Sequence, residues 1–284
     1  MLRLHVLGVG DAFSEQYHNA SLCVEEPQSG TLLLIDCPPA FPRVMADHRK
    51  KTNVDLSAHT IDHVLITHLH GDHCMGLEAY LFMRRFLVRR RPFLYGAKIV
   101  LDPLWENRLS GAMAYLAPPS QEFTQEEIDE HLRNPLHRDK KAHAVLQASR
   151  QVLLPPTQGL KLADYAERIN LSEKTAIGPL VIEHYFTCHH VPTTALRISL
   201  LGANEPLLSY SADTAFDPDL IAWLAEAKTI IHETNFGIHT PLHSLMLLPP
   251  AIRSRMHLIH YPDLLDCDKS PIPCLREGMV LTLT

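Results

Sequence analysis

Short runs rich in Val, Ile and Leu recur along most of the chain, separated by helix-like stretches. The runs are LRLHVLGV, TLLLID, HVLITH, AKIVLD, LVIEHYF, TALRISLL, PLLSYSAD, KTIIHE, MHLIHY and MVLTLT. An apolar run of this length is typical of a buried strand, and alternation of such strands with helices is typical of α/β folds. The sequence therefore predicts an α/β protein, and 284 residues suffice for one elaborated domain or two small ones.

The pattern changes to polar, helix-like sequence at about residues 103–178. This stretch contains several prolines and the acidic run QEFTQEEIDE. We interpret it as a helical insertion in the sheet framework. A structural cap, a dimer surface and a lid that shapes the substrate site are all compatible with it, and a homodimer stays open.

Composition narrows the class of protein. No apolar run reaches the length of a membrane span, and the first residues read as a strand and turn rather than a signal peptide. The six cysteines include no C-x-x-C pair, which is typical of a reducing compartment, so a cytoplasmic protein without membrane contact is expected. The formal charge of −6 argues against a protein that coats nucleic acid.

The stretch THLHGDH, residues 67–73, carries four potential metal ligands between a predicted strand and a predicted helix. Four ligands exceed what one ion with an open position needs, but they suit two adjacent ions. Further candidates end later strands. They are His184, His189, His190, Asp213, His232, Glu233, His257, His260 and Asp263.

These motifs resemble the successive ligand motifs of the metallo-β-lactamase superfamily. THLHGDH, HHVP, YSADT and LIHYPD occur in the order of that family, and HETNF followed by HSL is similar to a motif pair of ribonuclease Z and related phosphodiesterases. The resemblance implies a single domain over residues 1–284, an αββα sandwich of two mixed β-sheets with outer helices, interrupted by the insertion.

The resemblance also implies a ligand set for two divalent ions. One ion would be held by three histidines and the other by an aspartate and two histidines, with a bridging carboxylate. Zn²⁺ is the default, while Mn²⁺ or Fe suits the same imidazole and carboxylate ligands. We prefer His189 to His190 or His184, and His260 to His257. The implied ligands are His68, His70 and His189; Asp72, His73 and His260; and Asp213 as the bridge.

Two ions of this kind lower the pKa of a shared water, so a metal-bound hydroxide becomes available for hydrolysis. Asp72 is therefore counted with the catalytic residues as well as with the ligands. The resemblance nominates His243 as the acid for the leaving group, with Glu233 orienting it, and Asp36 as the carboxylate that orients a ligand imidazole.

The predicted function is a dinuclear metal-dependent hydrolase, with a ribonuclease Z-like phosphodiesterase acting on a small phosphoester or nucleotide as the favoured kind. Hydrolysis of a lactone, thioester or lactam, an RNA-processing nuclease that uses the arginines at positions 84–91, and a non-enzymatic metal-stabilised scaffold or redox sensor are the alternatives. The nuclease is disfavoured because only 23 residues separate His189 from Asp213, which excludes the long tRNA-binding arm of ribonuclease Z from that place. The chain also has Ala212 where relatives have Gly.

Overall fold

The computed structural model describes residues 1–115 and 159–284. The chain divides into two compact units, one comprising residues 1–108 and 162–284 and the other residues 109–161. In the smaller unit, the helix α5 (Ser110–Met113) is followed by a hydrogen bond of 2.8 Å from the Leu160 N–H to the Ala114 carbonyl oxygen. The larger unit carries the sheets and every candidate site residue.

Two mixed β-sheets form the framework of the larger unit. In the first, β1 pairs antiparallel with β13 and β2, β2 pairs antiparallel with β3, and β3 to β6 are parallel. Its order is β13 (Val280–Leu283), β1 (Leu2–Gly8), β2 (Ser21–Glu26), β3 (Thr31–Ile35), β4 (His63–Leu65), β5 (Phe93–Gly96), β6 (Glu167–Asn170).

The second sheet is parallel over three strands and antiparallel over the rest. Its order is β12 (Met256–Ile259), β11 (Thr229–Glu233), β10 (Leu208–Tyr210), β9 (Thr194–Leu200), β8 (Leu180–Phe186), β7 (Thr175–Ile177), with β12, β11 and β10 parallel.

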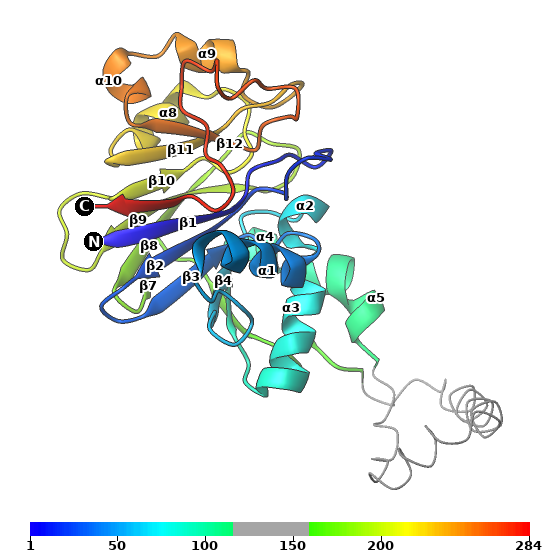
Figure 1. Ribbon diagram of the computed structural model, residues 1–284. Helices are drawn as coiled ribbons and strands as arrows, with labels where there is room; N and C mark the ends of the chain where they lie inside the picture. Colours follow the sequence, from blue (N-terminus) through cyan, green and yellow to red (C-terminus); the bar gives the residue numbers. More distant parts are fainter. Residues whose placement is uncertain (116–158) are drawn as a thin grey trace, which may run out of the picture. The chain divides into compact units, whose positions relative to one another are not determined.

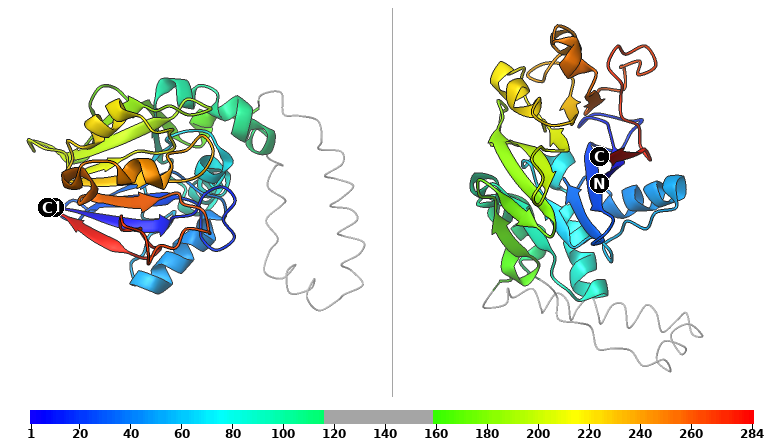
Figure 2. Two further views of the ribbon diagram at one scale, coloured as in Figure 1. Left: turned by 90° about the horizontal axis from the view of Figure 1, so that it is seen from above. Right: turned by 90° about the vertical axis from the view of Figure 1, so that its left-hand side faces the viewer.

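Helices cover the outer faces of the two sheets. Figures 1 and 2 show the sheets face to face, with α1 (Phe41–Thr52) outside the first and α8 (Pro218–Leu224) outside the second. Helix α8 begins after Asp217, whose side chain accepts a hydrogen bond from the Asp219 N–H. Within residues 1–115 and 159–284, the other helical segments of the larger unit and its boundary are α2 (Gly71–Cys74), α3 (Leu77–Met83), η1 (Arg84–Val88), α4 (Lys98–Leu101), η2 (Trp105–Leu109), η3 (Leu162–Asp164), α9 (Leu242–Met246) and α10 (Pro250–Arg253).

The core explains why the strand sequences are almost continuously apolar. On β3, Leu33 and Ile35 belong to the main hydrophobic cluster that also contains residues of the second sheet, while Leu34 between them is equally buried outside that cluster. Because successive strand residues point to opposite faces, β3 is covered by the second sheet on one side and by helices on the other. The predicted αββα sandwich is confirmed.

Two sequence predictions about elements are wrong. The run AKIVLD forms helix α4 instead of a strand, and the strand at this place, β5, ends at Gly96 just before it. The range 103–178 is not helical throughout, since β6 and β7 lie inside it. Residues 116–158 lie outside the described residues, so the helical character of the rest of the insertion stays a prediction.

No helix in the described ranges is both long enough and apolar enough to cross a lipid bilayer.

Candidate metal centre

The loop after β4 is fixed by one buried carboxylate. The Asp36 side chain accepts hydrogen bonds from the Thr67 N–H (2.8 Å) and hydroxyl, and its Oδ2 lies 2.8 Å from Nδ1 of His73. Asp36 follows β3 and adopts a left-handed backbone with φ 60°. The side chain therefore ties the end of one strand to the start of the metal-ligand loop after the neighbouring strand.

Close packing explains why glycine stands at position 76, between α2 and α3. Gly76 lies so near the Pro38 carbonyl that an added Cβ would be 2.0 Å from its oxygen. Any larger residue at position 76 would displace the end of α2, which carries Asp72 and His73.

The second sheet delivers three more site residues from loops that follow strands. His189 lies between β8 and β9, Asp213 follows β10, and His260 follows β12. Both His260 (φ 52°) and Ala212 (φ 48°), which precedes Asp213, have left-handed backbones that L-residues rarely adopt. The chain thus turns sharply where these side chains enter the site.

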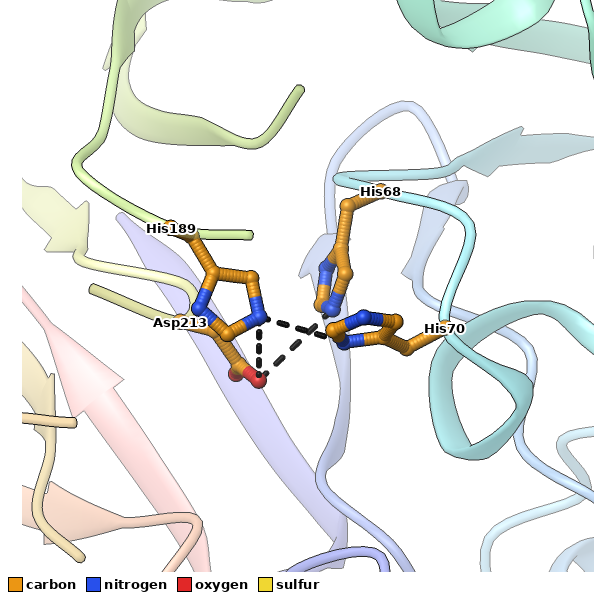
Figure 3. A group of neighbouring side chains, drawn as sticks. All are labelled: His68, His70, His189 and Asp213. Atoms are coloured by element: carbon orange, nitrogen blue, oxygen red, sulfur yellow. Dashed lines mark hydrogen bonds and ion pairs between the residues drawn. The ribbon is translucent and has the colours of Figure 1, made fainter. Parts of the chain in front are cut away.

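Figure 3 shows the first group of side chains, in which the potential ligand atoms all lie within 4.8 Å of one another. Nε2 of His189 is 3.1 Å from Nδ1 of His70 and 3.6 Å from Oδ2 of Asp213. Nε2 of His68 is also 3.6 Å from that oxygen. This group consists of His68, His70, His189 and Asp213.

A second group comprises Asp72, His73 and His260. Oδ2 of Asp72 is 3.2 Å from Nε2 of His73 and 3.3 Å from Nε2 of His260. Asp213 contacts this group too, with Oδ1 at 3.4 Å from His73 Nε2 and Oδ2 at 3.5 Å from His260 Nε2. Asp213 therefore lies between the two groups, in the position expected of a bridging ligand.

The side chains present fit divalent cations. Nε2 of His68, Nε2 of His73 and Oδ1 of Asp213 are buried, yet they make no hydrogen bond within the described parts of the chain. Buried polar atoms without partners are costly, and a cation in each group would together satisfy all three. The donor set of imidazole and carboxylate is one that binds Zn²⁺, Mn²⁺ or Fe.

The electrostatics of the groups also favour a cation. Burial by itself lowers the pKa of His73, but the carboxylates of Asp213 and Asp72 outweigh it and hold this pKa well above its ordinary value. Burial raises the pKa of the Asp213 carboxyl, yet the His260 and His73 imidazoles hold it well below its usual range. The negative field that favours a proton on His73 equally favours a bound metal ion.

A pair formed by a buried acid and a partly exposed imidazole lies beside the groups. Oε1 of Glu233 accepts a hydrogen bond from the Thr214 N–H (2.7 Å) and lies 2.8 Å from Nδ1 of His239. Burial and the nearby Asp213 raise the pKa of Glu233 well above its ordinary value. The ring of His239 is 5.3 Å from that of His189 and 5.2 Å from that of His260, measured between ring centroids.

The structure does not place His243, the predicted acid, over the metal groups. This residue is exposed on α9 and does not line the pocket over the metal groups, whereas His239 lines it and pairs with Glu233. Sequence reasoning missed His239 because the resemblance pointed to the HSL motif further along. The signal available was a histidine six residues after Glu233, in a loop between a strand and a helix.

The structure brings the seven predicted ligand residues together and leaves the rejected alternatives aside. His184 packs against Phe186 on β8, and His257 belongs to neither group. His190 lines the pocket but is exposed and also lies outside the groups.

The groups open into a pocket of about 650 Å³. Its outer part is formed by the loops after β1, β11 and β12, which contribute Phe13, Phe236 and Leu264. A pocket of this size suits a small molecule.

The sandwich and the paired His/Asp groups define a protein of the metallo-β-lactamase fold with a candidate dinuclear metal centre. Solved structures agree on the fold. The metallo-β-lactamase fold protein YhfI from Bacillus subtilis superposes with a TM-score of 0.65 at 15% identity, covering 99% of this chain and 98% of that one. A diphosphatase of the PhnP family superposes with a TM-score of 0.62 at 14% identity, covering 99% of this chain and 98% of that one. The short form of human tRNase Z superposes with a TM-score of 0.61 at 17% identity, covering 99% of both chains.

The chain belongs to the Anti-Pycsar protein Apyc1 family, whose model matches residues 2–271. The member from Paenibacillus sp. (strain J14) is 31% identical, with 99% of both chains covered. The member from Saccharibacillus brassicae is 30% identical, with 92% of this chain and 90% of that protein covered. The member from Bacillus phage 010DV004 is 27% identical, again with 92% of this chain and 90% of that protein covered.

Proposed function

We propose that the protein is a dinuclear metal-dependent phosphodiesterase that acts on a small phosphoester or nucleotide. The observation that carries this proposal is the Glu233–His239 pair beside two His/Asp groups that share Asp213. His68, His70 and His189 would hold one ion, and Asp72, His73 and His260 the other. When bound, the ions supply positive charge to the transition state and lower the pKa of water.

The chain's own residues account for the leaving group. When water oxygen attacks phosphorus and the P–O ester bond breaks, the departing alkoxide needs a proton. His239 Nε2 donates it, while Nδ1 stays hydrogen-bonded to Oε1 of Glu233, which keeps the ring oriented. Glu233 is in turn held by the Thr214 N–H. Asp36 keeps the His73 ring in place through Nδ1.

His239 could also serve as a metal ligand, because Asp213, His239 and His260 offer ligand atoms within 4.8 Å of one another. Replacing His239 would remove a metal ion if it is a ligand, but would leave the metal content unchanged if it is a proton donor. Metal content therefore separates the two roles.

Phosphoester chemistry is also supported by the family and the fold neighbours. Two of the neighbouring structures are a diphosphatase and a tRNase Z, enzyme names that denote hydrolysis at phosphorus. A thioester hydrolase has less need of the Glu233–His239 pair, because a thiolate departs without a proton.

An RNA-processing nuclease is less favoured because most of the arginine cluster is used within the fold. Arg84 is buried and, like Arg90, pairs with Asp62. Arg85 and Arg91 donate to the carbonyl oxygens of residues 164 and 163. These guanidinium groups therefore do not form a basic surface of free phosphate-binding groups.

The test combines metal analysis with a substrate panel. Protein purified without added metal should contain close to two divalent ions per chain at full occupancy. It should hydrolyse bis(4-nitrophenyl) phosphate and 3′,5′-cyclic mononucleotides in preference to a lactone, a thioester and a lactam. Activity should vanish with a chelator and return with added Zn²⁺ or Mn²⁺. A single ion per chain, or turnover of the carbonyl substrates alone, would defeat the proposal.

A further inference from the structure

Two free cysteines lie side by side in the segment that follows β12. The thiols of Cys267 and Cys274 are not joined in a disulfide, and their side chains hydrogen-bond each other. Cys274 belongs to the main hydrophobic cluster and is 8% exposed, while Cys267 packs against that cluster and is half-buried. The pair therefore joins a buried thiol to one that solvent reaches.

A tight turn between the two cysteines explains their proximity. The Ser270 hydroxyl donates a hydrogen bond to the Ile272 carbonyl oxygen (2.7 Å), and the Ile272 N–H donates to the Ser270 hydroxyl oxygen (3.4 Å). Pro271 and Pro273 flank Ile272 and restrict the backbone of the turn further. The chain thus returns to Cys267 within a short stretch of sequence.

The end of the turn is fixed to the second sheet. Leu258 of β12 donates its N–H to the carbonyl oxygen before Cys274 (2.8 Å) and accepts the N–H after it (2.9 Å). The Tyr261 hydroxyl donates to the Leu275 carbonyl oxygen (2.7 Å) and is also hydrogen-bonded to the Cys267 side chain. Both sulfur atoms are therefore held in one place, and neither has to move far for the two to join.

The surroundings of the two thiols give them different roles. Burial and the hydrogen bond with Cys267 raise the pKa of Cys274 to about 12, so this thiol stays protonated near neutral pH. Attack on an oxidant requires access to solvent and a thiolate. Cys267 is therefore the thiol that reacts first, and Cys274 is the thiol that completes the bond.

We propose that Cys267 and Cys274 are a thiol–disulfide modification site, which a low-molecular-weight disulfide oxidises to a reversible intrachain disulfide. In a reducing compartment the dithiol is the resting form, and the disulfide forms transiently when the oxidant accumulates.

The reaction takes two exchange steps. The Cys267 sulfur attacks one sulfur of the oxidant, whose S–S bond breaks, and the first small thiol leaves with the proton of Cys267. The Cys274 sulfur then attacks the Cys267 sulfur, and its proton passes to the second departing thiol. The two protein thiols are oxidised, the small disulfide is reduced to two thiols, and a thiol reductant reverses both steps.

Oxidation would act on a segment that anchors a neighbouring loop. Oδ2 of Asp263, four positions before Cys267, accepts hydrogen bonds from the N–H groups of Glu15 (2.8 Å) and Gln16 (3.2 Å). A disulfide holds its sulfur atoms about 2 Å apart, so it would tie the chain after Asp263 to Cys274 and through it to β12. We expect the segment 262–274 to become stiffer.

The test treats the full chain with oxidised glutathione, blocks the remaining thiols and maps the cysteines by mass spectrometry after trypsin. Cleavage after Lys269 separates the two cysteines into the peptides 256–269 and 270–276. Most of the native protein should yield these two peptides joined by a bond that a reductant breaks. The exposed Cys188 is the internal control, and its peptide should carry glutathione because no second thiol contacts it in the parts of the chain that the structure describes.

Two variants test the order of the steps. Cys274→Ser should retain glutathione on Cys267, because the thiol that displaces it is gone. Cys267→Ser should leave Cys274 unmodified, because that side chain is buried. Amide hydrogen exchange over residues 262–274 should be slower in the oxidised native protein than in the reduced one, and exchange in β2 should not change.

The cross-link in the native protein needs no substitution, so it decides the proposal even if a variant fails to fold. Joined peptides that appear only after unfolding in urea would overturn the site. Glutathione that remains on Cys267 in the native protein would do the same. Glutathione on Cys274 in Cys267→Ser would overturn the order of the steps.

Discussion

Oδ2 of Asp36 lies 2.8 Å from Nδ1 of His73, and neither side chain is exposed to solvent. The contact fixes the ring so that Nε2 faces Asp72 and Asp213. Asp36→Asn keeps an acceptor but removes the charge that makes the imidazole a strong ligand. We expect a loss of roughly 10- to 100-fold in affinity for one ion, measured by competition with a chelating dye. The surface variant Asp266→Asn serves as the control, and unchanged affinity in Asp36→Asn would contradict this role.

His239 should behave as a proton donor. His239→Ala should lower kcat by roughly 10²- to 10⁴-fold on a cyclic nucleotide, and far less on a nitrophenyl ester whose leaving group departs unaided. Metal content should stay at the native value. His243→Ala is the matched control, because that histidine is exposed and outside the pocket. Equal losses on both substrates would instead indicate a positioning role, and loss of an ion would make His239 a ligand.

Asp213 and Asp72 should differ in how many ions they hold. Asp213 contacts both groups, while Asp72 contacts only His73 and His260 among the ligand side chains. We expect Asp213→Ala to lose most of both ions and Asp72→Ala to retain one, in elemental analysis after dialysis. Retention of two ions by Asp213→Ala would rule out the bridging assignment.

Burial of His48 should make stability depend on pH. This side chain on α1 is 2% exposed, and burial together with the nearby His5 lowers its pKa to about 4. Because the unfolded chain binds a proton more readily than the folded one, stability should fall as pH drops from about 6.5 towards 4, by roughly 1 kcal/mol per pH unit. Urea unfolding at several pH values should show a shallower fall in His48→Gln. The exposed His59→Gln should match the native slope, and identical slopes for all three proteins would refute the assignment.

The left-handed backbone at Ala212 predicts a small effect of a smaller residue and a large effect of a branched one. Its φ of 48° costs an L-residue roughly 1–2 kcal/mol, which Gly would avoid, but Gly loses a buried methyl and gains entropy in the unfolded chain. Ala212→Gly should therefore change the free energy of unfolding by less than about 1 kcal/mol. Ala212→Val should destabilise by more than about 2 kcal/mol, because a branched Cβ is strained at positive φ and the site is fully buried. Equal thermal midpoints for the two variants would contradict the argument.

Most of the fold, and most of the residues that the structure groups as candidate ligands, could be predicted from the sequence because both depend on local signals. Apolar runs mark β1, β3, β8 and β9, and four of the site residues lie within the seven positions of THLHGDH. The strand β6, Glu167–Arg168–Ile169–Asn170, has almost no apolar side chains because it ends the sheet and is largely exposed, so no periodicity revealed it.

The missed site features depend on contacts between distant segments. His239 can be distinguished from His243 only by its approach to Glu233, and Phe13 meets the same pocket as Phe236 only through the folded chain. The run AKIVLD was ambiguous because four apolar or aliphatic positions fit one helical turn as well as a strand.

The division of the ligands between the two sheets has a consequence for the order of assembly. Four of the seven residues follow β4 of the first sheet, and the remaining three come from loops of the second, as much as 188 positions away in the contact of Asp72 with His260. Neither sheet alone presents a complete set, so a newly made chain would acquire its full metal complement only after the sheets have packed. Ions bound at that stage would link the two sheets and slow their separation. Metal binding in a cell would then follow folding rather than drive it.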